Sequence, residues 1–194
     1  MGFPLVEFPT LGLQMHLLPI TKVQFEHFLA ESRKFDDNWY ETVLKLNPRV
    51  SYRNFTADKR ERLFLTGILI DEAQEFANWL GEEFDLPTAD EWRACYKLLR
   101  ELKLPTTDNL LNNLNNCSKP AQIIIRRLLS QIHPKTLLEL SLMEEGVMEW
   151  VKGRDAKWKL LGKPRQSFQP ALRKTLEELH PFLTSGFSSM AFDW

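Results

Sequence analysis

The segment Leu86–Trp92, LPTADEW, carries the strongest local structure signal in the chain. Pro87 fixes its own φ and keeps the chain extended, and the Thr88 side chain can accept the first unpaired N–H groups of a helix. Glu91 follows Thr88 by three residues, so the two form the capping box of a helix N-terminus. The helix that follows has four large or apolar side chains on one face, Trp92, Cys95, Tyr96 and Leu99. We therefore predict that this face, Cys95 included, packs into a core.

Two more helices are predicted upstream. The first begins with the capping box TKVQ at Thr21, runs to about Arg33, and has an apolar face made of Phe25, Phe28 and Leu29. The second has Asp71 as its N-cap, with Gln74 at the third helical position, and ends before Gly81. Its apolar stripe consists of Ala73, Phe76, Ala77 and Leu80.

The rest of the chain alternates polar and apolar segments. The Asn- and Thr-rich run between Pro105 and Pro120 is typical of an exposed connection, because these side chains compete with helix hydrogen bonds. Two short helices, Ala121–Ile132 and Lys135–Met143, are predicted on either side of Pro134. Four short apolar segments are predicted to be strands: Leu63–Ile70, Val147–Val151, Trp158–Leu161 and Gly186–Phe192.

Composition narrows the class of protein. A length of 194 residues with 43% hydrophobic residues fits one domain with a sizeable core. The 25 basic and 26 acidic residues give a net charge of −1, which lacks the positive field of a nucleic-acid-binding protein. The longest uncharged apolar stretch, Leu63–Ile70, is far shorter than the roughly 20 residues that span a bilayer. The N-terminus has no basic region of a signal peptide, so we expect a cytoplasmic protein that binds neither nucleic acid nor membrane.

The residues that bind metals or form disulfides are few. Cys95 and Cys117 could form at most one disulfide, and we expect both to be free thiols in a reducing compartment. The four histidines show no spacing typical of a metal site. The sequence therefore predicts no bound metal or cofactor.

Four segments, in order, resemble signature blocks of the formylglycine-generating enzyme, or sulfatase-modifying factor, family. Leu18–Phe25 is similar to the family's PVTNAQY, Gly67–Gly81 to GVSWEDAQAYCRWLG, and Leu86–Trp92 to LPTEAEW. Leu140–Val151 is similar to LYDMAGNVWEWV, and Ser185–Phe187 resembles the closing GFR. The resemblance implies an α+β, C-type-lectin-like fold with short irregular strands and several helices. It implies one domain over residues 1–194, with an inserted polar loop and helices at about 105–140.

The same resemblance indicates what this chain lacks. Enzymes of the family bind copper through two cysteines late in the chain and oxidise a cysteine of their substrate. The late segment Trp158–Trp194 contains no cysteine, and neither Cys95 nor Cys117 matches the catalytic positions. Soft thiolates are the ligands that select Cu(I). The chain therefore resembles a divergent member without catalytic residues.

Three functions remain open on the sequence. The first is a protein-binding or scaffold module, an accessory subunit whose partner-binding residues are Trp158, Lys163, Arg165 and Trp194. Aromatic and Arg side chains are enriched among interface hot spots, which favours this hypothesis. The second is a variable ligand-binding protein of a diversity-generating retroelement, and the third is an enzyme with a repurposed active site. The oligomeric state is left open.

Overall fold

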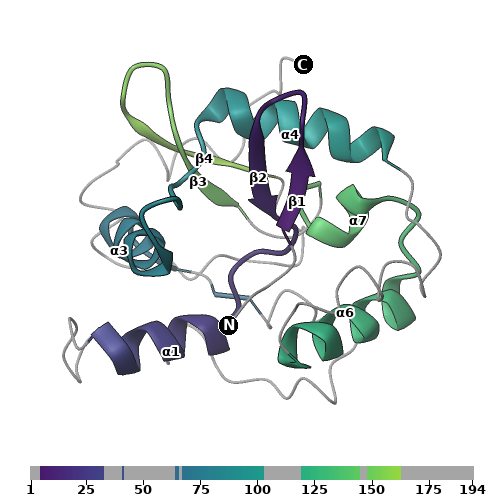
Figure 1. The fold of residues 1–194 in the computed structure, drawn as a ribbon, viewed down its shortest axis with the longest axis horizontal. Coiled ribbons are helices and arrows are strands. Elements are labelled where there is room, and N and C mark those ends of the chain that lie inside the picture. The colour runs from purple at the N-terminus through teal and green to yellow at the C-terminus, as the bar shows by residue number, and fades with distance from the viewer. Residues whose placement is uncertain are drawn as a thin grey trace, which may run out of the picture.

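The computed structural model describes residues 5–32, 41, 64–65, 67–102, 119–144 and 148–162. Within these ranges the chain combines helices with two small antiparallel hairpins, which is consistent with the expected α+β class (Figure 1). The strands are β1 (Leu5–Phe8), β2 (Leu13–His16), β3 (Glu149–Lys152) and β4 (Trp158–Leu161). The helices are α1 (Lys22–Ser32), α3 (Ile70–Leu80), α4 (Ala89–Glu101), α6 (Lys119–Ile132) and α7 (Leu137–Ser141).

The β1–β2 hairpin was not predicted from the sequence. Its register pairs Leu5 with His16 and Phe8 with Leu13. The turn between the strands contains Pro9 and Gly12, and the positive φ of 65° at Gly12 suits a residue without Cβ. One face of the hairpin packs toward α4 through Val6, Phe8, Leu13 and Met15. The strands therefore contribute directly to the core.

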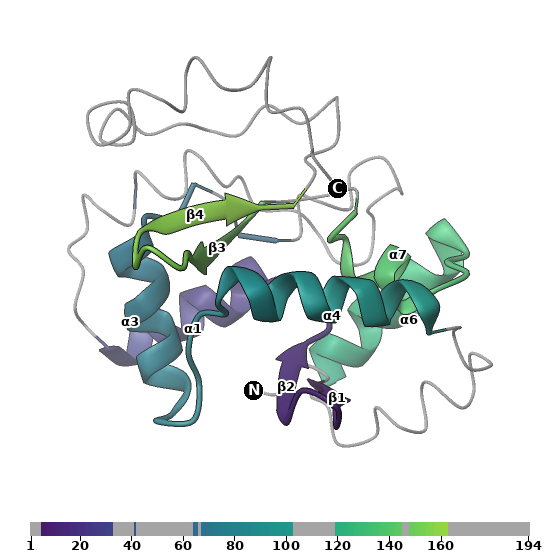
Figure 2. The same cartoon turned by 90° about the horizontal axis from the view of Figure 1, so that it is seen from above.

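Helix α4 lies between the two hairpins, with β3–β4 on one side and β1–β2 on the other (Figures 1 and 2). Its predicted capping box is confirmed: the Glu91 N–H donates to Thr88 Oγ1 at 3.2 Å, and the Thr88 N–H donates to Glu91 Oε2 at 2.7 Å. The predicted buried face is also confirmed, for all four side chains are buried: Trp92, Cys95, Tyr96 and Leu99.

The start of α3 differs from the prediction. Asp71 and Gln74 do not form the cap, because the helix already begins at Ile70. The Leu69 N–H donates to the carboxylate of Glu72 at 2.8 Å, so the helix is capped two residues before the predicted N-cap. The helix ends before Gly81, as predicted.

The predicted strand Leu63–Ile70 is wrong where the structure describes it. Phe64 forms only an isolated antiparallel bridge with Thr21, and Ile70 belongs to α3. The strands predicted at Val147–Val151 and Trp158–Leu161 are confirmed as β3 and β4, within the described residues. The strand predicted at Gly186–Phe192 lies outside the described residues.

Helices α6 and α7 confirm the two helices predicted around Pro134. Thr136 caps α7 by accepting the Glu139 N–H at 3.2 Å. The predicted polar connection between Pro105 and Pro120 lies mainly in 103–118, outside the described residues. None of the helices in the described ranges combines the length and apolarity needed to cross a membrane.

Among the residues that the structure describes, the buried side chains form three clusters. The first is built on α6 and contains Leu17, Leu18, Phe64, Ile124, Ile125, Leu128, Leu140 and Leu142. The second is built on α4 and contains Phe8, Ala89, Trp92, Cys95, Tyr96, Leu99, Leu138, Met143 and Val151. The third joins α1 to α3 through Phe25, Phe28 and Phe76.

Candidate functional site

The Pro87–Thr88 pair is bonded to strand β3. The Lys152 N–H donates to the Pro87 carbonyl oxygen at 2.9 Å, and Thr88 forms a parallel bridge with Lys152. The extended conformation that Pro87 imposes thus allows the segment to pair with a strand just before the helix begins. The two segments that carry the LPTADEW and Leu140–Val151 sequences meet at this point.

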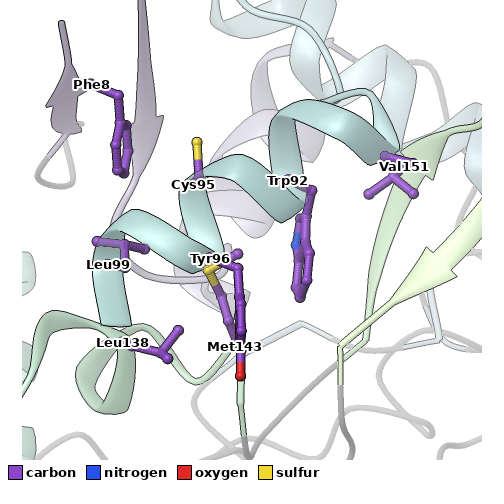
Figure 3. Packing of buried hydrophobic residues seen from close by; sticks show 9 residues of the cluster. Phe8, Trp92, Cys95, Tyr96, Leu99, Leu138, Met143 and Val151 are labelled. Carbon is purple, nitrogen blue, oxygen red and sulfur yellow. The ribbon is translucent and has the colours of Figure 1, made fainter. Parts of the chain in front are cut away.

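Trp92 and Glu149 make the closest side-chain contact between these two segments. The Trp92 Nε1–H donates to Glu149 Oε2 at 2.6 Å. The Trp92 ring stacks on Tyr96, with ring centroids 5.6 Å apart and an interplanar angle of 13°. Figure 3 shows both rings on the same face of α4, with Met143 beside Tyr96. The Tyr96 hydroxyl in turn lies 3.4 Å from Glu144 Oε1, so both rings have a carboxylate as hydrogen-bond partner.

Two further contacts extend this arrangement. The Trp150 Nε1–H donates to the Ile68 carbonyl oxygen at 2.8 Å, which ties β3 to the segment before α3. On the surface, Arg154 binds Asp90 through two hydrogen bonds of 2.7 and 3.1 Å. These bonds hold the pKa of Asp90 below its usual range. We call six of the side chains that make these contacts the block junction: Asp90, Trp92, Tyr96, Glu149, Trp150 and Arg154.

The electrostatics of the block junction centre on Glu149. Desolvation raises the pKa of this carboxyl group, and the hydrogen bond from Trp92 opposes the shift. A raised carboxyl pKa is a property of many general acids. Here desolvation of the partly buried carboxyl group accounts for the raised pKa, while the Trp92 indole N–H, which can only donate, stabilises the charged form. The arrangement therefore fits a structural role for the block junction.

A pair of Glu149 variants tests this role. Glu149→Ala leaves the buried indole N–H without an acceptor, and we expect a loss of about 1 to 3 kcal/mol of folding stability. Glu149→Gln keeps an acceptor and should be at least as stable as the wild type at pH 7.

The raised pKa of Glu149 also predicts how stability depends on pH. The folded protein holds the Glu149 proton more tightly than the unfolded chain does. The wild type should therefore lose stability as pH rises from 4.5, the ordinary pKa of the group, through its raised pKa in the folded state. Urea denaturation from pH 4 to 8 checks both expectations, and an equal loss in the two variants would contradict them.

Cys95 belongs to the same buried part of α4, although its side chain points in a different direction from Trp92 and Tyr96 (Figure 3). Only 1% of the residue is exposed, and desolvation raises the pKa of its thiol to about 11. The thiol is therefore protonated at neutral pH, which makes it a poor nucleophile and a poor metal ligand. The expectation that Cys95 is a free core residue is confirmed. Cys117 lies outside the described residues.

A thiol reagent should distinguish the two cysteines. In native protein we expect Cys117 to react rapidly and Cys95 to react only after denaturation, because its thiol is buried and protonated. Mass spectrometry of the labelled peptides measures both rates. A Cys95→Ala, Cys117→Ser double variant should fold and keep its function. Loss of an activity in a folded double variant would contradict the interpretation that neither thiol is catalytic.

His16 lies at the end of β2. Both ring nitrogens are buried and have no hydrogen-bond partner among the described residues, and the ring stacks on Phe84 at 5.8 Å. Burial lowers the pKa of His16, so the ring is neutral at pH 7. Across the part of the chain that the structure describes, there is no group of three His, Cys, Asp or Glu side chains that could hold a metal ion.

Of the predicted partner-binding residues, the structure describes one. Trp158 begins β4, opposite Lys152 in the hairpin, and is partly exposed. Lys163, Arg165 and Trp194 lie outside the described residues. Their role in partner binding therefore stays a prediction. The Trp92–Glu149 and Asp90–Arg154 contacts were not predicted, although three of the four residues lie in the quoted sequence blocks.

Comparison with known proteins identifies the family of the chain. A sequence model of the sulfatase-modifying factor enzyme 1-like domain matches residues 4–112. That match covers more than half of the chain and includes β1, β2, α1, α3 and α4. The comparisons found no match among curated proteins and none among solved structures. The chain therefore belongs to the sulfatase-modifying factor family.

Proposed function

We propose that this chain is a non-catalytic binding or scaffold module, an accessory subunit that presents a protein-interaction surface in the cytoplasm. In this proposal, residues 1–194 form one C-type-lectin-like domain, with the segment at about 105–140 as an insertion. The family membership and the mixture of helices and small sheets support this fold.

The placement of Cys95 carries the proposal. A copper centre of the kind that the resemblance implies needs two thiolates, and this sequence contains Cys95 and Cys117 alone. Cys95 packs in the α4 cluster with its thiol protonated, so it cannot ligate copper without opening the core. That leaves one cysteine, Cys117, where the chemistry requires a pair.

The block junction supports the same proposal. Its acidic side chains already have structural partners, Glu149 with Trp92 and Asp90 with Arg154. Together with the pairing of Pro87 to β3, the bond between Trp92 and Glu149 stabilises a frame that can present loops to a partner.

The C-terminal segment is the proposed contact surface, and two substitutions test it. Arg165→Ala and Trp194→Ala should each weaken partner binding by about 2 kcal/mol, roughly 30-fold, because such anchors dominate interface energies. The melting temperature should be nearly unchanged. The partner is captured from native extract with the wild-type chain, identified, purified and titrated with each variant.

Arg154→Ala is the matched control, since its side chain is 85% exposed and makes a surface ion pair. Exposed ion pairs contribute about 0 to 1 kcal/mol, so this variant should keep both its melting temperature and its binding. Unchanged binding by both C-terminal variants would place the functional surface elsewhere in the chain.

A further inference from the structure

Helix α6 has one buried face and one exposed face. The buried face packs into the first core cluster through Ile124, Ile125 and Leu128, each at most 1% exposed. The opposite face follows the spacing of three and four residues that keeps side chains on one side of a helix. We call it the basic stripe, and it consists of Lys119, Ile123, Arg126, Ser130 and His133, all of them exposed.

The charge of this region is of one sign. From residue 119 to residue 138 the sequence has no Asp or Glu, and its Lys and Arg residues are Lys119, Arg126, Arg127 and Lys135. None of these four cations has an ion-pair partner within the described ranges. Ile123 stands between Lys119 and Arg126 and is 47% exposed. An apolar side chain flanked by unpaired cations is a surface suited to an acidic protein partner.

A segment of opposite charge lies elsewhere in the same chain. From residue 67 to residue 92 the sequence has no Lys or Arg, and its acidic residues are Asp71, Glu72, Glu75, Glu82, Glu83, Asp85, Asp90 and Glu91. Glu82 and Glu83 lie in the turn directly after α3 and are both exposed. Figures 1 and 2 place α3 and α6 toward opposite ends of the long axis of the molecule. The two charged surfaces therefore cannot meet within one molecule.

We propose that the basic stripe of α6 binds the turn after α3, through Glu82 and Glu83, of a second copy of this chain. Complementary charges steer the encounter and fix its orientation, and burial of Ile123 adds an apolar contact. Nucleic acid fits less well, because the whole chain has a net charge of −1 and the exposed apolar side chain of Ile123 separates Lys119 from Arg126. Helix α6 also lies outside residues 4–112, the part of the chain that the family model matches.

The size of the contact between the basic stripe and the turn after α3 determines how strongly two copies should associate. A helix of 14 residues is about 21 Å long, which is too small for an interface of the standard size of about 1,600 Å². We therefore expect self-association that is weak, concentration-dependent and sensitive to salt. Sedimentation velocity of the full chain, from about 10 to 500 µM at about 20 mM and about 500 mM salt, measures it. The average mass should rise with concentration at low salt and return to that of a monomer at high salt.

Charge reversal on each side provides the decisive test. The Lys119→Glu, Arg126→Glu variant has two acidic surfaces, and the Glu82→Lys, Glu83→Lys variant has two basic ones. Each should associate at least about tenfold more weakly than the wild type. A mixture of the two variants should associate again, because each then meets a surface of opposite charge. Lys97→Glu, an exposed change on α4, is the matched control and should leave association unchanged.

Circular dichroism confirms that each variant is folded before it is compared. Three results would overturn the proposal: a monomeric wild type at every concentration in low salt, association that the Lys119→Glu, Arg126→Glu variant leaves intact, or no recovery in the mixture. The samples are also titrated with a labelled RNA and a labelled DNA duplex. Binding of either by a monomeric wild type, lost in the Lys119→Glu, Arg126→Glu variant, would assign the stripe to nucleic acid instead.

Discussion

Trp92→Ala is expected to lower the free energy of unfolding by about 3 to 5 kcal/mol, the usual cost of removing a buried tryptophan. Trp92 is 4% exposed, stacks on Tyr96 and donates to Glu149. Truncation therefore removes the packing of a large ring and leaves the partly buried Glu149 carboxylate without its donor. Domains are stable by only about 5 to 15 kcal/mol, so this loss is a large fraction of the total and should lower the melting temperature substantially.

Trp92→Phe separates the two contributions. Phenylalanine keeps an aromatic ring beside Tyr96 but has no N–H for Glu149, so we expect a smaller loss than with alanine. Urea denaturation followed by far-UV circular dichroism measures both variants. An alanine variant with the stability of the wild type would mean that Trp92 is not part of the core.

The capping boxes were predictable because the signal is local. Thr21 with Gln24 and Thr88 with Glu91 lie three residues apart, and both pairs form the expected hydrogen bonds. The buried face of α4 follows from the helical period alone. The same reasoning failed at α3, because the residue at its N-cap is the apolar Leu69. The side chain of Glu72 caps this helix by accepting the Leu69 backbone N–H, and no polar N-cap residue marks the position in the sequence.

The elements that depend on distant partners were not predictable. Strands β1 and β2 are four residues each, and their apolar face becomes informative only once α4 packs against it. Leu63–Ile70 is apolar enough for a strand, but Phe64 pairs with Thr21 only as an isolated bridge. In the block junction, Glu149 and Trp92 are 57 residues apart, and no sequence period links them.

The third core cluster leads to the other large expected effect. Phe28 is 1% exposed and contacts Phe25, Phe76 and Trp79, with ring centroids 5.1, 5.5 and 5.6 Å away. Phe28→Ala should destabilise the protein by about 3 to 5 kcal/mol, because these rings cannot close the cavity that remains. Phe28→Leu, which keeps most of the volume, is the matched control and should lose less.

This variant also tests whether the chain is one cooperative domain. The α1–α3 cluster shares no buried residue with the other two clusters, within the described residues. It is joined to them by the hydrogen bond from Trp150 to Ile68 and by the isolated bridge between Thr21 and Phe64, a residue of the first cluster. If these links couple the clusters, Phe28→Ala should shift a single unfolding transition, and circular dichroism and tryptophan fluorescence should give the same midpoint. Two transitions, of which Phe28→Ala moves one and Trp92→Ala the other, would show that α1 and α3 unfold separately from the α4 cluster and would contradict the single domain.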